Sequence, residues 1–205
     1  MMKRRLAILL SGRGSNFLAI HDAIEAKRIP AEIVLVVSNR LGAPGLERAI
    51  ELGYETRTID HRGYESREKH EHDVIVAIEL AGVDLIILAG YMRLLSEGFV
   101  TRFANRILNI HPSLLPAFPG VDAQRQALEH GVKTTGCTVH FVDAELDGGP
   151  IILQRSVDVR DDDTAESLSA RILEQEHIAY PEAIRRVCSV PFRVEGRRVI
   201  FENED

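Results

Sequence analysis

At its centre the chain reads Arg106-Ile107-Leu108-Asn109-Ile110-His111-Pro112-Ser113-Leu114-Leu115-Pro116. The apolar residues at the start predict a buried strand, which delivers an amide and an imidazole to a loop stiffened by prolines. Residues two apart in a strand point to the same face, so Asn109 and His111 are expected to share one face and Ile110 the other. Ligands of an open α/β sheet bind beyond the carboxyl ends of its strands, and this pair lies at such an end.

Similar apolar, β-branched runs occur earlier in the chain, with segments of helical pattern between them. Near-continuous hydrophobicity predicts strands that are covered on both faces. The strands are expected at 6–10, 33–37, 83–88 and 106–110, and the helices at 16–27, 44–52 and 64–81. This alternation predicts an α/β, Rossmann-like fold, with a mostly parallel central sheet and helices on both faces.

The last third of the sequence predicts an antiparallel C-terminal part. Two strands are expected at 134–142 and 151–159, joined by a polar, Gly-rich turn, and a small hairpin at 192–200. Asp161-Asp162-Asp163-Thr164 opens a long helix that runs towards Cys188, because acidic and capping groups favour a helix start. Pro181 lies inside this helix and is expected to kink or split it.

Composition limits the classes of protein to which the chain can belong. Its 205 residues, 45% of them hydrophobic, suit one compact domain, and its net charge of −6 argues mildly against nucleic acid as the main partner. The basic start resembles a signal peptide, but Ser11-Gly12-Arg13-Gly14 interrupts the apolar run too early. No run is long enough to span a bilayer, and Cys137 and Cys188 give no disulfide framework, so a cytoplasmic location is expected.

The loop Ser11-Gly12-Arg13-Gly14-Ser15-Asn16 follows the first strand and begins a helix. Free N–H groups at a helix start form a cradle for phosphate. The third glycine of the dinucleotide fingerprint is replaced by Phe17, and no Lys-Ser/Thr pair of a Walker A loop follows. A phosphate monoester is therefore favoured over NAD, with a plain strand-to-helix turn as the alternative.

A second loop, Ala89-Gly90-Tyr91-Met92-Arg93-Leu94-Leu95, follows the strand at 83–88. Its aromatic, thioether and aliphatic groups beside one guanidinium suit a flat heteroaromatic ligand. Ordinary core packing with Arg93 at the surface is the alternative interpretation.

Asp147, in the turn Asp147-Gly148-Gly149-Pro150, is the natural carboxylate to orient His111, although Asp-Gly is also common in ordinary turns. Asn109, His111 and Asp147 together indicate acyl transfer without a Ser or Cys nucleophile. No metal site is expected, because His70 and His72 are two apart and would point to different faces of a helix; with His61 they are interpreted as solvated. Cys137 is expected in the core.

These motifs identify a resemblance to a known family. The stretch 109–116, with Gly136-Cys137-Thr138-Val139-His140-Phe141-Val142 and 147–152, resembles the folate-dependent formyltransferase superfamily. The loop 11–16 and Glu174-Gln175-Glu176-His177 are similar to the members that act on a glycinamide ribonucleotide. The resemblance covers residues 6 to about 201 and implies one domain, 1–205, with a nucleotide-binding half at about 1–100 and a folate and catalytic half at about 101–205.

The resemblance also implies the site residues by position. The catalytic group is Asn109, His111 and Asp147. The ribonucleotide is held by Gly14, Ser15, Asn16, Leu173, Glu174, Gln175 and Glu176. The folate is held by Arg67, Met92, Arg93, Leu94, Leu95, Asn109, Asp143, Ala144, Glu145, Leu146 and Asp147. Asp122 and Gln124 stand where some members carry histidines, and Arg13 occupies a variable position.

The implied reaction moves a formyl group from 10-formyltetrahydrofolate, a co-substrate, to the amine of 5′-phosphoribosylglycinamide in purine synthesis. Asn109 and His111 are expected to stabilise the oxyanion, and Asp147 to favour the charged form of His111 and assist proton transfer. No metal, nucleic acid or membrane is implied. A homodimer is compatible with the sequence, with the strand near Val83 to Leu88 or a neighbouring helix face as its contact. A cis bond before Pro116 is left open.

Three alternatives remain. A formyltetrahydrofolate hydrolase would use water as acceptor and usually carries an added regulatory domain. A methionyl-tRNA formyltransferase needs a basic C-terminal domain, whereas this sequence ends in Glu202-Asn203-Glu204-Asp205. A Rossmann-like redox enzyme or nucleotide-binding regulator would need the glycine fingerprint that is incomplete here.

Overall fold

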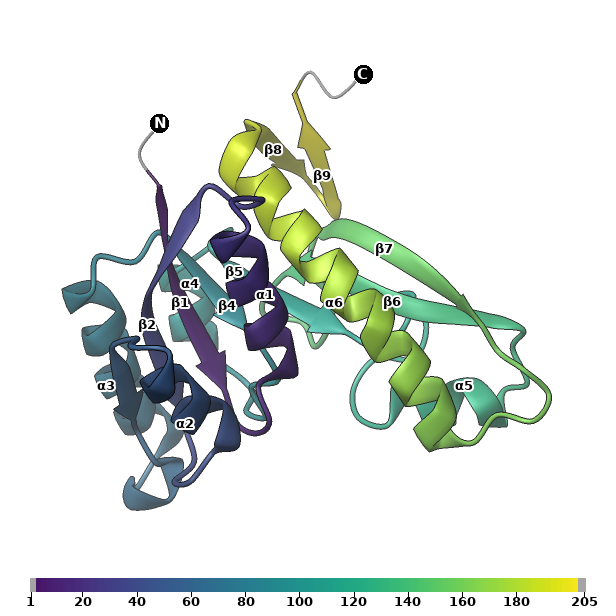
Figure 1. Ribbon diagram of the computed structural model, residues 1–205, viewed down its shortest axis with the longest axis horizontal. Helices are drawn as coiled ribbons and strands as arrows, with labels where there is room; N and C mark the ends of the chain where they lie inside the picture. The colour runs from purple at the N-terminus through teal and green to yellow at the C-terminus, as the bar shows by residue number, and fades with distance from the viewer. Residues whose placement is uncertain (1–2, 203–205) are drawn as a thin grey trace. The chain divides into compact units, whose positions relative to one another are not determined.

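The computed structural model describes residues 3–202, and the predicted helices and strands follow one another in the expected order, with four short elements between them that were not predicted (Figure 1). Residues 1–2, at the start that resembles a signal peptide, and 203–205, in the acidic end weighed against a tRNA substrate, lie outside the described part. The chain divides into two compact units, Met1–Leu108 and Asn109–Asp205.

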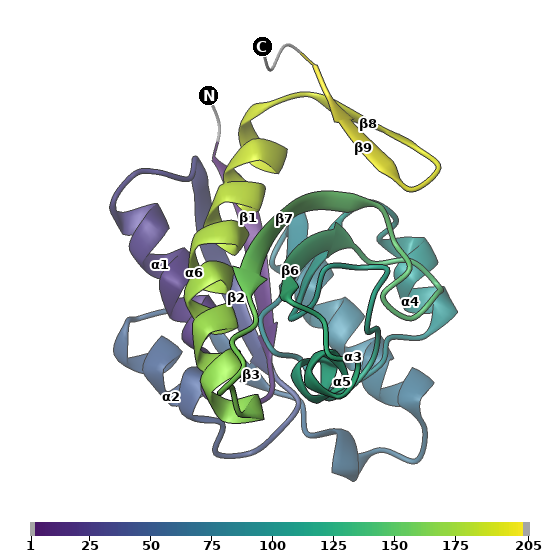
Figure 2. The ribbon, with the colours of Figure 1, turned by 90° about the vertical axis from the view of Figure 1, so that its right-hand side faces the viewer.

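The first unit holds a parallel sheet in the strand order β3-β2-β1-β4. Its strands are β1 (Arg4–Leu10), β2 (Ala31–Ser38), β3 (Thr56–Thr58) and β4 (Leu85–Leu88). Its helices are α1 (Ser15–Glu25), α2 (Pro44–Glu51), α3 (Arg67–Leu80) and α4 (Glu97–Arg102), with a short 3₁₀ turn η1 (His61–Gly63). Figure 2 shows α1 and α2 on one face of this sheet and α3 and α4 on the other.

Burial explains why the apolar runs predict these strands. Residues 6–10 of β1 are all 0% exposed, and β4 is almost as deeply buried. Such strands contribute side chains to both faces, so they lack the alternation of a half-exposed strand. Of the two dimer contacts that the sequence suggested, the strand near Val83 to Leu88 is excluded, because β4 is buried, pairs with β1, and donates from Ile86 N to Arg106 O at 2.8 Å. The neighbouring helix face stays a prediction.

The second unit contains antiparallel strands, as predicted. β5 (Ile107–His111) crosses the division between the units. The other elements are β6 (Thr134–Phe141), β7 (Ile151–Asp158), β8 (Phe192–Glu195), β9 (Arg198–Phe201), α5 (Ala123–Glu129) and α6 (Ala165–Ser189). β6 and β7 pair antiparallel, as do β8 and β9, in the order β6-β7-β9-β8. Helix α6 lies along β6 and β7 (Figure 2).

Helix α6 begins as predicted but does not split. Thr164 and Ser167 form a reciprocal capping box at its start. The helix then continues through Pro181, so of the two effects predicted for this proline, a kink or a split, the split is wrong. Proline removes one backbone donor, but here Pro181 lies on the buried face with Tyr180 and Ile184, and this packing outweighs the local cost.

The histidines of α3 also differ from expectation. His72 is exposed, but His70 is 0% exposed, so the interpretation of both as solvated is wrong for His70. His70, Val74 and Ile78 recur at the four-residue spacing of one helix face and are all buried. His70 Nε2 donates to Ile59 O at 2.9 Å, and burial lowers the pKa of this imidazole.

Candidate active site

Strand β5 presents Asn109 and His111 at its carboxyl end, and a loop of the same unit brings Asp147 to His111. Asp147 Oδ2 lies 3.4 Å from His111 Nδ1. The other ring nitrogen, Nε2, lies 2.8 Å from the carbonyl oxygen of Phe118. The Phe118 carbonyl can only accept a hydrogen bond, so Nε2 carries a proton, and Nδ1 faces a carboxylate oxygen. The His111 side chain is 6% exposed and that of Asp147 is 10% exposed.

The backbone around Asp147 is shaped to bring its carboxylate to this position. Asp147 has a φ of 51°, in the left-handed region that Asp and Asn tolerate better than most residues. Its Oδ2 also accepts the N–H of Gly120 at 2.8 Å. A Cβ on Gly149 would overlap the carbonyl oxygen of Phe141, so the turn depends on a glycine at that position.

His140, which was not among the predicted catalytic residues, lies between those that were. Its Nε2 is 3.3 Å from Asn109 Nδ2 and 3.9 Å from Asp147 Oδ1, and the residue is only 2% exposed. Desolvation lowers the pKa of His140, although the nearby Asp147 opposes the shift. The only signal in the sequence was a single imidazole within an apolar strand, which is more often a core residue.

A buried hydroxyl fixes the loop that follows His111. Thr138 Oγ1 donates to Ser113 O at 2.7 Å, and accepts from Leu115 N at 3.0 Å and Gln154 Nε2 at 3.0 Å. The Leu115-Pro116 peptide bond is cis, the geometry that the sequence had left open. This loop is therefore held to β6 and β7 by a satisfied polar network, which keeps the end of β5 in a defined position.

In the first unit, the predicted phosphate loop joins β1 to α1. Gly14 has a φ of 74° and stands at the N-cap of α1, followed by Ser15 and Asn16 in the first turn. A Cβ on Gly14 would lie 2.8 Å from Gly45 Cα, so the loop and the start of α2 approach too closely for a side chain. The first N–H groups of a helix have no partner within the helix, so this terminus has the donors that an anion needs.

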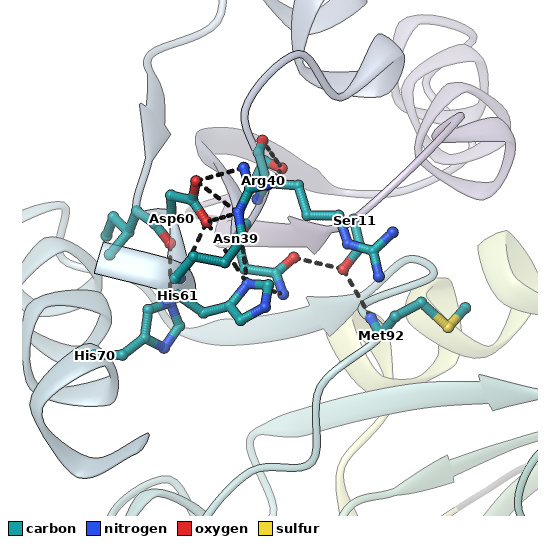
Figure 3. A network of polar contacts seen from close by, with 10 residues as sticks. Ser11, Asn39, Arg40, Asp60, His61, His70 and Met92 are labelled. Atoms are coloured by element: carbon teal, nitrogen blue, oxygen red, sulfur yellow. Dashed lines mark hydrogen bonds and ion pairs between the residues drawn. The ribbon is translucent and has the colours of Figure 1, made fainter. Parts of the chain in front are cut away.

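A polar network connects this loop to the predicted folate loop at 91–95 (Figure 3). Ser11 Oγ donates to Asn39 Oδ1 at 2.6 Å and accepts from Met92 N at 2.8 Å. The half-buried His61 donates from Nδ1 to Asn39 O at 2.8 Å, so it too departs from the solvated state expected of it. The segments that follow β1, β2 and β4 are thus tied together. Ser11 and Asn39 could have been found as polar residues directly after strands.

The other end of the folate loop is fixed by a buried carboxylate. Glu71, 3% exposed, accepts from Ser96 N at 2.8 Å and from the Ser96 hydroxyl. Within the loop Met92 and Leu94 are 69% and 63% exposed, which leaves apolar surface available to a ligand. Arg67 is exposed at the first turn of α3 in the same unit.

The remaining predicted residues lie in the second unit. Glu176 is on the buried side of α6, one turn from Leu173, while Glu174 is exposed. Gln175 accepts from Arg155 Nε at 2.9 Å. The predicted folate loop before Asp147 is otherwise largely exposed. Its members are Asp143, Ala144, Glu145 and Leu146.

Two groups that depart from the family pattern make contacts of their own. Asp122 has a φ of 56° and pairs with Arg125, and Gln124 donates to Ser169 at 3.5 Å.

Cys137 is buried as predicted, and desolvation raises the pKa of its thiol to about 12. Across residues 3–202, no three His, Cys, Asp or Glu side chains are grouped so that they could hold a metal ion. Within the same part of the chain, no helix has the length and apolarity needed to cross a bilayer.

Comparison with known proteins relates this arrangement to one family. The formyl transferase family model matches residues 4–184. The phosphoribosylglycinamide formyltransferase of Escherichia coli is 46% identical over 97% of this chain and 91% of its own length. The crystal structure of glycinamide ribonucleotide transformylase 1 from Symbiobacterium toebii has a TM-score of 0.95 and 52% identity, covering 98% of this chain and 94% of that one.

A longer relative shares the same region. The trifunctional purine biosynthetic protein adenosine-3 of Gallus gallus is 49% identical over 91% of this chain, which spans 19% of that protein's length. The agreement with the Symbiobacterium toebii structure confirms the predicted α/β fold. Because the family model covers most of the sequence and the Escherichia coli relative matches along nearly its whole length, the chain belongs to the formyl transferase family, as its motifs predicted.

Proposed function

We propose that this chain transfers the formyl group of 10-formyltetrahydrofolate to the amine of 5′-phosphoribosylglycinamide, a step of purine synthesis. The observation that carries the proposal is the contact between His111 and Asp147 at 3.4 Å, at the end of the strand that also bears Asn109. The 46% identity to the Escherichia coli phosphoribosylglycinamide formyltransferase supports this choice of acceptor.

The proposed reaction needs no covalent enzyme intermediate, because a neutral amine is itself a nucleophile. The amine nitrogen bonds to the formyl carbon, and the carbonyl electron pair moves to oxygen. The tetrahedral centre then collapses as the bond from the formyl carbon to the folate nitrogen breaks. One proton leaves the amine and one reaches the folate nitrogen, so the proton count balances. The enzyme's task is then positioning and stabilisation of charge.

Asn109 and His111 are the proposed donors to the developing oxyanion. The Asn109 amide carries two N–H bonds, of which His140 receives one and the other is available to substrate. His111 Nε2 now donates to Phe118 O, so donation to the oxyanion requires the substrate oxygen to replace that carbonyl. Removal of one such donor typically lowers turnover about a hundredfold or more.

Asp147 supplies the negative charge that stabilises the imidazolium form of His111. Its two oxygens are used differently: Oδ2 faces His111 and the Gly120 N–H, and Oδ1 faces His140 at 3.9 Å. A carboxylate at this position also provides a base for the amine proton, through a water molecule. The proposal therefore gives Asp147 two roles, charge stabilisation and proton transfer.

The phosphate of the ribonucleotide is proposed to bind at the start of α1. Changing Ser15 and Asn16 to alanine is expected to raise the Michaelis constant for the ribonucleotide about tenfold or more, since hydrogen bonds to charged groups are among the stronger ones. Steady-state kinetics with each substrate varied in turn measures this, and the Michaelis constant for the folate is the internal control. Equal increases for both substrates would contradict the assignment.

The proposal as a whole is tested by a spectrophotometric assay with 10-formyltetrahydrofolate, run with the ribonucleotide and with water alone as acceptor. Rapid loss of the formyl donor only with the ribonucleotide is the expected result. Equal loss in water would favour a hydrolase, and binding of NAD without folate would favour a redox enzyme.

The absence of a metal requirement, the cytoplasmic location and a homodimer remain predictions from the sequence. The Glu176 assignment and the other folate and ribonucleotide contacts remain proposals from the resemblance.

A further inference from the structure

His140 is held in a defined protonation pattern by its own strand. Its Nδ1 lies 2.8 Å from the carbonyl oxygen of Phe141, which can only accept a hydrogen bond, so Nδ1 carries a proton. A neutral ring then has a bare Nε2, which can only accept. The group 3.3 Å from that nitrogen is Asn109 Nδ2, a donor. The two side chains therefore match only when the imidazole is neutral.

This contact selects one of the two orientations of the Asn109 amide. With Nδ2 on His140, the second N–H bond of the same nitrogen remains available. The flipped amide would set its carbonyl oxygen against the lone pair of His140 Nε2, which is repulsive, and would exchange the positions of donor and acceptor. Only the first orientation matches an oxyanion, which requires a donor.

We propose that neutral His140 is a positioning residue that holds the Asn109 carboxamide with an N–H bond directed at the reacting oxygen. The inference rests on the proposed formyl transfer and adds a residue that acts through Asn109. His140 is 2% exposed, so the ring has little access to water and its few polar contacts define its state.

Protonation of His140 would remove this function. An Nε2–H would face the Asn109 donor, and it would be drawn to Asp147 Oδ1 at 3.9 Å, in competition with His111 for that carboxylate. Burial lowers the pKa of His140 below its ordinary value of 6.5. The charged or titratable groups facing it are His111 on β5 and Asp143 and Asp147 in the loop before Pro150. Turnover is therefore expected to fall as pH decreases through that lowered pKa.

Two variants separate this role from simple packing. His140→Leu fills the space without an acceptor, whereas His140→Gln keeps a carbonyl oxygen near the position of Nε2 and does not titrate. Both variants lose the Nδ1–H group that donates to Phe141 O. A difference in kcat between them therefore reports the contact with Asn109. Cys137→Ala, equally buried in the same strand, is the matched control. Each variant is assayed for kcat and for both Michaelis constants between pH 5 and pH 9, after its thermal unfolding midpoint has been measured.

In His140→Leu, kcat is expected to fall by about tenfold to a hundredfold. This loss is smaller than the loss that follows removal of an oxyanion donor itself. The Michaelis constant for the ribonucleotide is expected to stay unchanged. In His140→Gln, kcat should stay within about threefold of the wild-type value. Its pH profile should lack the decrease at low pH that protonation of His140 causes. Equal kcat losses in the two variants, or normal turnover in His140→Leu, would overturn the proposal.

A measurement independent of turnover completes the test. Nitrogen-15 NMR of histidine-labelled protein should show His140 protonated at Nδ1 and bare at Nε2 at neutral pH, with the Nε2 signal shifted in Asn109→Ala. A protonated Nε2, or no shift, would overturn the proposal even if the enzyme were active. A wild-type chain that binds but does not formylate the ribonucleotide would overturn the proposed function alone, because the NMR signals still decide the His140–Asn109 contact.

Discussion

Asp147→Asn is expected to lower kcat for formyl transfer by about 10²- to 10⁴-fold, the range typical of lost acid–base catalysis, while the fold is retained. The substitution is nearly isosteric, and Asn tolerates the left-handed backbone at this position. Its amide oxygen can still accept the Gly120 N–H that Asp147 Oδ2 accepts at 2.8 Å. The change therefore removes the negative charge beside His111 and leaves the local hydrogen bonding largely intact.

Kinetics at saturating concentrations of both substrates, with a thermal unfolding curve for each protein, measures this effect. Asp158→Asn makes the same change in net charge at an exposed position, at the end of β7 opposite the turn that carries Asp147, and should have normal activity. Near-normal turnover in Asp147→Asn would remove Asp147 from the mechanism.

Gly149→Ala is expected to impair both stability and turnover. The new Cβ would overlap the Phe141 carbonyl oxygen, a backbone atom that cannot rotate away. The same oxygen accepts the His140 Nδ1 proton at 2.8 Å, so any shift of the turn also moves His140 and Asp147. Overpacking of this kind destabilises by about 1–3 kcal/mol, and a misplacement of about 1 Å in the site costs about a hundredfold in rate.

Chemical denaturation and steady-state kinetics on the same preparation give the two effects. Gly98→Ala in α4 is the matched control, because the nearest atom to its new Cβ would be Ser96 Oγ at 3.9 Å, an ordinary contact. A Gly149→Ala protein with wild-type stability and turnover would show that the turn can move without cost, which would contradict the close packing described for it.

The strands were predictable because burial leaves a direct mark on composition. β1 and β4 are continuous apolar runs, since side chains on both faces of these strands are covered. β3 was missed because its three residues are polar, with Thr56 partly buried and Arg57 and Thr58 exposed, so no apolar run marks them. The split predicted at Pro181 was wrong because it rested on local propensity alone. The packing that keeps the helix continuous depends on residues distant in sequence.

The residue types of the candidate site could be chosen from the sequence, but their contacts could not. Asn109 and His111 share a strand end, and Asp147 is a carboxylate in a Gly-rich turn, so their types and positions indicated what they could do. His140 could not be selected in this way, because an imidazole in an apolar strand has the same local pattern whether it fills space or orients a neighbour. Its separation from Asn109, 3.3 Å, depends on pairing between strands, which the sequence does not display.

The three side chains proposed to act in formyl transfer, and His140, which is proposed to position one of them, all come from one unit and one continuous part of the chain, between Asn109 and Asp147. The proposed reaction centre is therefore encoded separately from the proposed phosphate loop at 11–16. A protein built in this way can change its proposed phosphate contacts near the amino terminus without rebuilding the catalytic machinery, whereas the acceptor contacts proposed at 173–176 lie in the same unit as that machinery. Modular inheritance of this kind gives a structural reason why one chemistry can serve several acceptors in the course of evolution.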